Sequence, residues 1–151
     1  MQKKQIEKIL NQAKKLAIEY RELTGKPLGI TREIGEFTAA KLLNLELTKA
    51  RQAGYDAIDD KREKIQTRSL NNIKGYRLGK LSSNQEWDSV MFVRLNREYD
   101  PISIHKAYRK EVIGELNRSG SKTRNERGLL GVRKFISISK EIWKLDSNEK
   151  N

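Results

Sequence analysis

Oxygen-bearing and cationic side chains recur at short spacing in the stretch GYDAIDDKREKIQTRSL, residues 54–70. Asp56 follows a Gly-Tyr pair, and Gln66 and Arg68 lie two residues apart beyond a charged turn. A carboxylate and an amide oxygen could hold a hard cation such as Mg²⁺ or Mn²⁺, because Mg²⁺ takes oxygen ligands and keeps several waters. In phosphodiester hydrolysis such an ion orients and acidifies the attacking water, while a neighbouring cation stabilises the transition state. These residue types could therefore perform metal-assisted cleavage of a phosphodiester.

Two strands are predicted to carry these side chains. The segments YDAI and KIQTRSL are short and partly apolar, the second one alternating, and DDKRE between them is typical of a tight polar turn. The two segments are therefore expected to pair as a hairpin. Because side chains alternate across a strand, Lys64, Gln66 and Arg68 should project from one side of theirs, with Asp56 on the paired strand.

A helix before the hairpin could supply a further carboxylate. It is predicted to run from Thr31, as its N-cap, to about Asn44. Glu33 and Glu36 lie three residues apart, so they project from nearly the same face of this helix. Either of them could lie over the end of the sheet that bears Asp56.

The same residues also have ordinary structural explanations. Asp56 could cap a turn, and Gln66 and Arg68 could decorate a half-exposed strand. Glu33 and Glu36 could compensate the dipole of their helix, as acids in a first turn commonly do. The residues alone leave both interpretations open.

The charge balance points to a polyanionic partner. Lys and Arg number 32 against 20 Asp and Glu, which gives a net charge of +12 and a pI near 9.9. Such a surplus attracts polyanions through counterion release, and nucleic acid is the commonest polyanion in a cell. One basic patch is expected to contact phosphates, although a cationic loop can also be merely solvated. This patch consists of Lys122, Arg124, Arg127, Arg133 and Lys134.

Several classes of protein are excluded. The chain has no cysteine, so it has no disulfide or thiolate metal site, and His105 has no His or Cys partner for zinc. The sequence shows no P-loop, Rossmann glycine pattern or nucleophile elbow. The N-terminus lacks the apolar stretch of a signal peptide, and no window approaches the roughly 20 apolar residues of a spanning helix. These features predict a soluble, cytoplasmic protein without membrane contact.

The remaining elements complete one α/β domain over residues 1–145, with a disordered tail at 146–151. An amphipathic helix is predicted over 3–23, a buried strand in WDSVMFVRL, a strand at ISIH and a helix over 106–117. A final helix over 133–145 is expected to bury Phe135, Ile138, Ile142 and Trp143. The order predicts a central mixed sheet of four strands flanked by helices. The long first helix could also mediate a homodimer.

The arrangement resembles the PD-(D/E)XK, or restriction-endonuclease-like, superfamily. Its pattern is a helix glutamate, an aspartate on a strand, and an acid or glutamine two residues before a lysine on the next strand. Here IGEFTAAKLL is similar to the helix segment, GYDAI to the aspartate strand and IQTR to the last element. Longer segments, among them TGKPLGITREIGEFTAAKLLNLEL, EWDSVMFVRLN and SKTRNERGLLGVRKF, are similar to a small group of bacterial proteins of unassigned function.

The resemblance implies a restriction-endonuclease-like fold and a role for each matching residue. Asp56 would bind the metal, Gln66 would supply an oxygen, and Glu36 would be the helix glutamate, with Glu33 as its substitute. Arg68 stands where the family has lysine. Because arginine stays protonated, it cannot act as a base, although it can stabilise a transition state. Lys64, on the same side of the strand, could replace it.

The sequence therefore predicts a Mg²⁺- or Mn²⁺-dependent DNA endonuclease, of a defence or mobile-element system. Two alternatives stay open. One is a catalytically inactive DNA-binding relative. The arginine at position 68 and the neutral Gln66 would be consistent with such a protein. The other is a basic interaction protein that binds an acidic partner or RNA.

Overall fold

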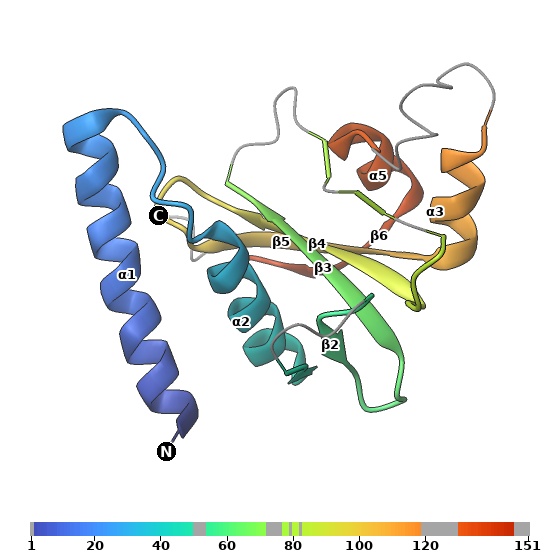
Figure 1. The fold of residues 1–151 in the computed structure, drawn as a ribbon, viewed down its shortest axis with the longest axis horizontal. Helices are drawn as coiled ribbons and strands as arrows, with labels where there is room; N and C mark the ends of the chain where they lie inside the picture. The colour runs from blue at the N-terminus through green and yellow to red at the C-terminus, as the bar shows by residue number, and fades with distance from the viewer. Residues whose placement is uncertain are drawn as a thin grey trace.

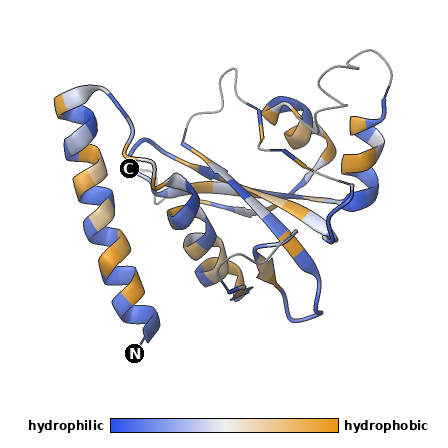
Figure 2. Cartoon of the chain, in the orientation of Figure 1, coloured by the Kyte–Doolittle hydropathy of each residue, from blue (hydrophilic) through white to orange (hydrophobic). Residues whose placement is uncertain are grey.

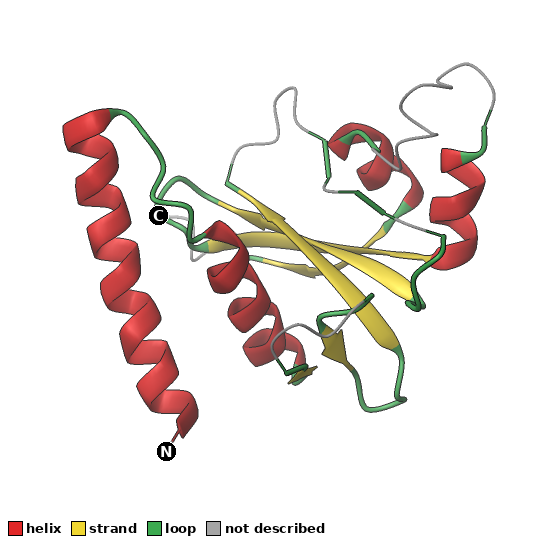
Figure 3. Cartoon of the chain, in the orientation of Figure 1, coloured by secondary structure: helices red, strands yellow, loops and turns green. Residues whose placement is uncertain are grey.

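The computed structural model describes residues 2–49, 54–71, 77–78, 80–81, 83–118 and 130–146. Its elements form an α/β domain with one mixed sheet of six strands and, in the described ranges, four helices, as Figures 1 and 3 show. The predicted fold class is thus confirmed. The helices are α1 (Gln2–Thr24), α2 (Thr31–Leu43), α3 (Arg109–Leu116) and α5 (Val132–Ile138), and the strands are β1 (Glu46–Leu47), β2 (Ala57–Ile58), β3 (Lys64–Leu70), β4 (Ser89–Leu95), β5 (Pro101–Tyr108) and β6 (Lys140–Lys144).

The strands lie side by side in chain order, β1-β2-β3-β4-β5-β6. Only β3 and β4 run parallel, and every other neighbouring pair is antiparallel. The expected hairpin is confirmed, since Ala57 pairs with Ile65 and Ile58 with Lys64. Its turn is closed by Asp59, whose Oδ1 accepts hydrogen bonds from two backbone N–H groups further along the turn. The sheet thereby places β3 between its hairpin partner β2 and the buried strand β4.

The sheet is buried on both faces, so the domain has three layers (Figure 1). Successive side chains of β4 point to opposite faces, and each face has its own apolar cluster. Figure 2 shows the corresponding apolar residues along the central strands. One cluster contains Val90 and Phe92 of β4 with Val112 of α3 and Phe135 of α5, and the other contains Met91 and Val93 of β4 with Ala17 of α1 and Ile34 of α2.

A glycine allows α2 to approach β3 closely. Gly35 is buried, and a Cβ atom at this position would overlap the side chain of Ser69 on β3. Any larger residue would have to push the helix away from the strand, which typically costs about 1–3 kcal/mol in a packed core. The close contact holds the first turns of α2 beside the strand that carries Gln66 and Arg68.

The segment before β4 is anchored by Arg109. Its guanidinium donates hydrogen bonds to the carbonyl oxygens of Ser83, Gln85 and Trp87, at 2.6, 3.0 and 2.9 Å, and lies over the Trp87 ring at 4.6 Å. These bonds tie residues 83–87 to the start of α3.

The predicted final helix was wrong in its second half. α5 ends at Ile138, Ser139 is extended, and β6 follows, so Ile142 and Trp143 lie on a strand. The stretch around Ile136, Ile138 and Ile142 has apolar residues at even spacing as well as helical spacing, so its periodicity suits either element. Pairing with β5, in which Trp143 lies opposite Ile104, selects the strand.

Other predicted boundaries also shifted. Thr31 is the first residue of α2 rather than its N-cap, which is Ile30. The strand at ISIH extends to Tyr108, so the next helix begins at Arg109 instead of 106. The sheet has six strands rather than four, because β1 and β6 were not expected. The expected tail lies outside the described residues, apart from Asp146. No described helix is both long and apolar enough to cross a membrane.

Candidate active site

Asp56 is held against the edge of β3 by two backbone contacts. Its N–H donates to the carbonyl oxygen of Ile65 at 2.8 Å, and its Oδ2 accepts from the N–H of Thr67 at 2.8 Å. The Asp56 side chain is only 14% exposed. The carboxylate therefore has a fixed position beside the strand, immediately before β2 begins.

Gln66 and Arg68 lie next to each other on β3, as the alternation predicted. Arg68 Nη2 donates to Gln66 Oε1 at 2.9 Å and to the carbonyl oxygen of Lys80 at 2.9 Å, and Nη1 donates to that of Thr67 at 3.1 Å. Nη1 also lies 3.8 Å from Asp56 Oδ2. The Gln66 amide nitrogen donates to the carbonyl oxygen of Gly54 at 2.7 Å, which orients its oxygen toward Arg68. The predicted set of Asp56, Gln66 and Arg68 thus meets in space.

Arg32 joins this set to the helix glutamate. Arg32 Nε donates to Glu36 Oε1 at 2.9 Å, and Nη2 donates to Asp56 Oδ1 at 3.3 Å. Sequence reasoning missed Arg32, although its spacing of four residues from Glu36 on a predicted helix is a signal for such a pair. The result is an alternating series of polar and charged side chains, called the active-site series below: Gln66, Arg68, Asp56, Arg32 and Glu36.

The charges of the active-site series depend on one another. Burial raises the pKa of Glu36, the nearby charges of Asp56 and Glu33 raise it further, and Arg32 opposes both effects. Burial lowers the pKa of Arg68, the charge of Arg32 adds to this, and Asp56 and Glu36 oppose it. The hydrogen bond to Glu36 is the main reason why the pKa of Arg32 is raised. The two guanidinium groups therefore balance the two carboxylates.

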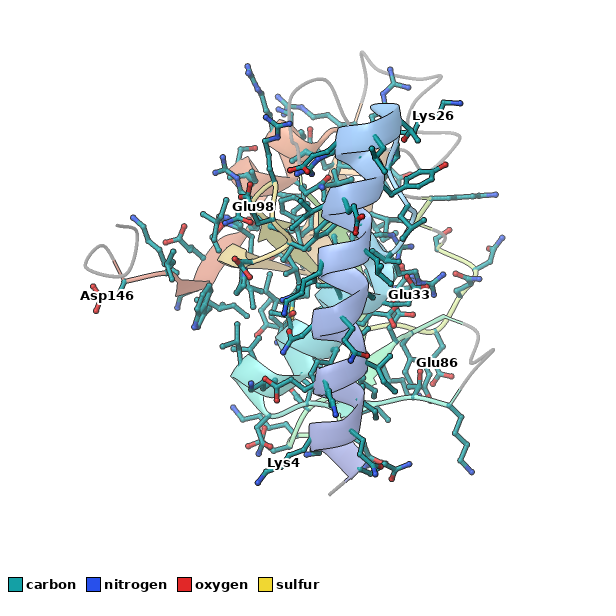
Figure 4. All side chains as sticks on the ribbon, turned by 90° about the vertical axis from the view of Figure 1, so that its left-hand side faces the viewer. Lys4, Lys26, Glu33, Glu86, Glu98 and Asp146 are labelled. Carbon is teal, nitrogen blue, oxygen red and sulfur yellow. The ribbon has the colours of Figure 1, made fainter. Side chains whose placement is uncertain are left out.

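Two other candidates lie outside the active-site series. Lys64 directs its ammonium to Glu86 and over the Tyr55 ring, 5.5 Å from the ring centroid, rather than toward Asp56. Glu33 is exposed on the first turn of α2, where Figure 4 labels it. Its charge contributes to the raised pKa of Glu36.

The predicted basic patch is described only in part. Lys122, Arg124 and Arg127 lie outside the described residues. Arg133 and Lys134 lie on α5, where Lys134 Nζ is 3.6 Å from Glu115 Oε1. A DNA contact by these residues stays a prediction.

The oxygen atoms of the active-site series suit a hard cation. In the described part of the chain, no group of three or more His, Cys, Asp and Glu side chains could hold a metal ion. However, Mg²⁺ is commonly bound through one or two carboxylates and several waters. Asp56, Glu36 and the Gln66 amide supply oxygens of this kind, although Arg32 and Arg68 engage the same atoms. The donor set is therefore chemically compatible with Mg²⁺ or Mn²⁺.

Comparison with known proteins gives a family match over most of the chain. A family model described as Bsp6I restriction endonuclease matches residues 1–145. A search of the curated proteins gives no match.

Proposed function

The chain belongs to the Bsp6I restriction endonuclease family, and from this premise we propose that it cleaves DNA by metal-dependent hydrolysis of phosphodiester bonds. Membership itself supports a DNA endonuclease with a restriction-endonuclease-like fold. The observation that carries the metal-dependent reaction is the fixed Asp56 carboxylate beside Gln66 on the neighbouring strand. We place the activity in a defence or mobile-element system, and a lower plating efficiency of bacteriophage on cells that express the chain would support this setting.

Asp56, the Gln66 oxygen and Glu36 are the groups that would hold the cation. When bound, a divalent cation supplies an acidified attacking water and neutralises charge on the phosphate. Arg68 keeps the Gln66 oxygen in place through its 2.9 Å hydrogen bond. Because a guanidinium remains protonated, Arg68 does not take the proton from the attacking water.

Metal dependence can be tested with the purified protein and long duplex DNA of mixed sequence. We expect cleavage in Mg²⁺ or Mn²⁺ and none in EDTA, because the proposed reaction needs a cation to acidify the attacking water and neutralise charge on the phosphate. Single-stranded DNA, assayed in parallel, would identify the preferred substrate. Cleavage that persists in EDTA would contradict the proposed use of a metal.

A catalytically inactive DNA-binding relative is the second candidate. The observation in its favour is that Arg68 and Arg32 already engage the oxygens of Gln66, Asp56 and Glu36. Binding of DNA without cleavage under all metal conditions would support it. The third candidate, a basic interaction protein, rests on net charge alone.

We also propose a homodimer formed through the outer face of α1. This face carries Ile9, Leu16 and Leu23, which are 61%, 60% and 79% exposed, together with the partly exposed Ile6 and Tyr20. Successive members of this set are three, seven, four and three residues apart, so they form a seam along about 25 Å of helix. Figure 4 looks directly onto α1, which lies in front of the other described elements.

Charge favours an antiparallel second copy of this helix. The first turns of α1 carry Lys3, Lys4 and Lys8 against Glu7, whereas its last turns carry Glu19 and Glu22 against Arg21, so the two ends differ in net charge. This distribution is unfavourable for the dipole of a single helix, because cations lie near its positive end. An antiparallel copy would place the basic end of one helix beside the acidic end of the other.

Light scattering of the full chain tests this dimer. We expect the mass of a dimer for the natural sequence and that of a monomer for Leu16→Glu, which buries a charge in the seam. Leu47→Glu changes an exposed leucine on β1 and should leave the dimer intact. A natural chain that remains monomeric at high concentration would contradict the proposal.

A further inference from the structure

The guanidinium of Arg68 on β3 donates its hydrogen bonds to acceptors within the protein. Arg68 donates to Gln66 Oε1 and to the carbonyl oxygens of Thr67 and Lys80, and its side chain is only 23% exposed. A guanidinium held by three protein acceptors on a mostly buried side chain has little freedom to turn to a substrate. Arg68 is therefore placed to position Gln66 and the strand rather than to contact a phosphate.

Arg32 has the opposite surroundings. Its side chain is 72% exposed, and its two contacts in the active-site series are with Glu36 and Asp56. Both partners are carboxylates that would share their charge with a bound cation. The contact to Asp56 is also long, at 3.3 Å. Arg32 can thus exchange these partners for another anion without disturbing the core.

We propose that Arg32 is the cation of this site that contacts the DNA phosphate, in place of the residue on β3. This inference rests on the proposed function, because it assigns a role within the same site. A guanidinium binds phosphate with two parallel hydrogen bonds, and its fixed charge stabilises charge that builds on the phosphate oxygens. Arg32 lies between Asp56 and Glu36 and would be free to turn to the phosphate if these carboxylates held a cation instead.

Substitution of Arg32 separates this role from a structural one. For Arg32→Gln we expect kcat for DNA cleavage in Mg²⁺ to fall by about 10²-fold, as for the loss of one transition-state donor. The urea midpoint of unfolding should not change, because the side chain is mostly exposed. Arg32→Lys keeps the positive charge but not the paired donors, so its loss should be about tenfold or less.

DNA binding supplies a second measurement that does not depend on cleavage. Affinity for a mixed-sequence duplex, measured in Ca²⁺ and in EDTA at several salt concentrations, reports the number of phosphate contacts. The loss of one contact should make the slope of log K against log salt shallower by about 0.9 in Ca²⁺. Arg62→Gln is the matched control, since it removes one arginine that is 75% exposed and paired with Glu46. Its kcat and salt slope should equal those of the natural chain.

Three outcomes would overturn the inference. The first is cleavage by Arg32→Gln at the natural rate, and the second is an unchanged salt slope. The third is a lower urea midpoint for Arg32→Gln together with an Arg32→Lys protein that is equally inactive. Arg32 would then have a structural role. If the natural chain cuts no DNA, the proposed function fails, and the salt slope alone then decides whether Arg32 contacts phosphate.

Discussion

Replacement of Asp56 by asparagine is expected to abolish DNA cleavage while leaving the protein folded and able to bind DNA. The asparagine oxygen can still accept the 2.8 Å hydrogen bond from the Thr67 N–H, so the strand edge keeps its geometry. The negative charge that would bind the metal is lost, however. A loss of at least about 10³-fold in kcat is the scale seen when a central catalytic group is removed. The measurement is single-turnover cleavage in Mg²⁺ beside a DNA-binding assay.

The neighbouring acid provides the control for this experiment. Asp60 is exposed in the turn of the same hairpin, and Asp60→Asn removes the same charge away from the active-site series. Its cleavage rate should stay close to that of the natural chain. If Asp56→Asn cleaves as fast as Asp60→Asn, Asp56 has only a structural role, and the proposed metal site is wrong.

Replacement of Arg68 by methionine is expected to destabilise the fold strongly. It removes hydrogen bonds to the Lys80 and Thr67 carbonyl oxygens and to Gln66, and leaves Asp56 without a nearby buried cation. Losses of this kind typically cost about 3 kcal/mol in free energy of unfolding, or roughly 6–12 °C in Tm for a chain of this size. Urea denaturation measures the change directly.

The exposed Arg62→Met is the control, because its surroundings predict almost no change in stability. Arg68→Lys should retain part of the stability, since an ammonium can satisfy some of the three acceptors. A stable Arg68→Met protein that has lost cleavage would instead identify Arg68 as a catalytic residue. That outcome would also count against Arg32 as the cation that contacts the DNA phosphate.

The core of the site was predictable because its geometry is local. Alternation along one strand and a tight turn suffice to bring Asp56 beside Gln66 and Arg68. Arg32 was missed because its partner Asp56 lies 24 residues away, and the distance is bridged only when α2 packs on β3 through Gly35.

Lys64 shows the limit of reasoning from alternation. The pattern predicts the side of the strand from which this side chain leaves, but not the partner that it then meets. That partner, Glu86, is held by a segment that Arg109 anchors from beyond the next two strands. The number of strands was underestimated for the same reason, because strand formation also depends on the partners that a segment meets. β1 has only two residues, and β6 forms because β5 offers a free edge.

The residues of the proposed chemistry all come from the first half of the chain. Every member of the active-site series lies between positions 32 and 68, whereas α3, α5 and the predicted basic patch belong to the second half of the chain. The strongly paired β4 lies between these two halves and is buried on both faces. Asp56 and Glu36 are held by contacts to β3 and Arg32, so substitutions on the outer surfaces of α3 and α5 that spare Arg109 should not move these carboxylates. Such a division would let relatives evolve new target sites while they inherit one unchanged cleavage centre.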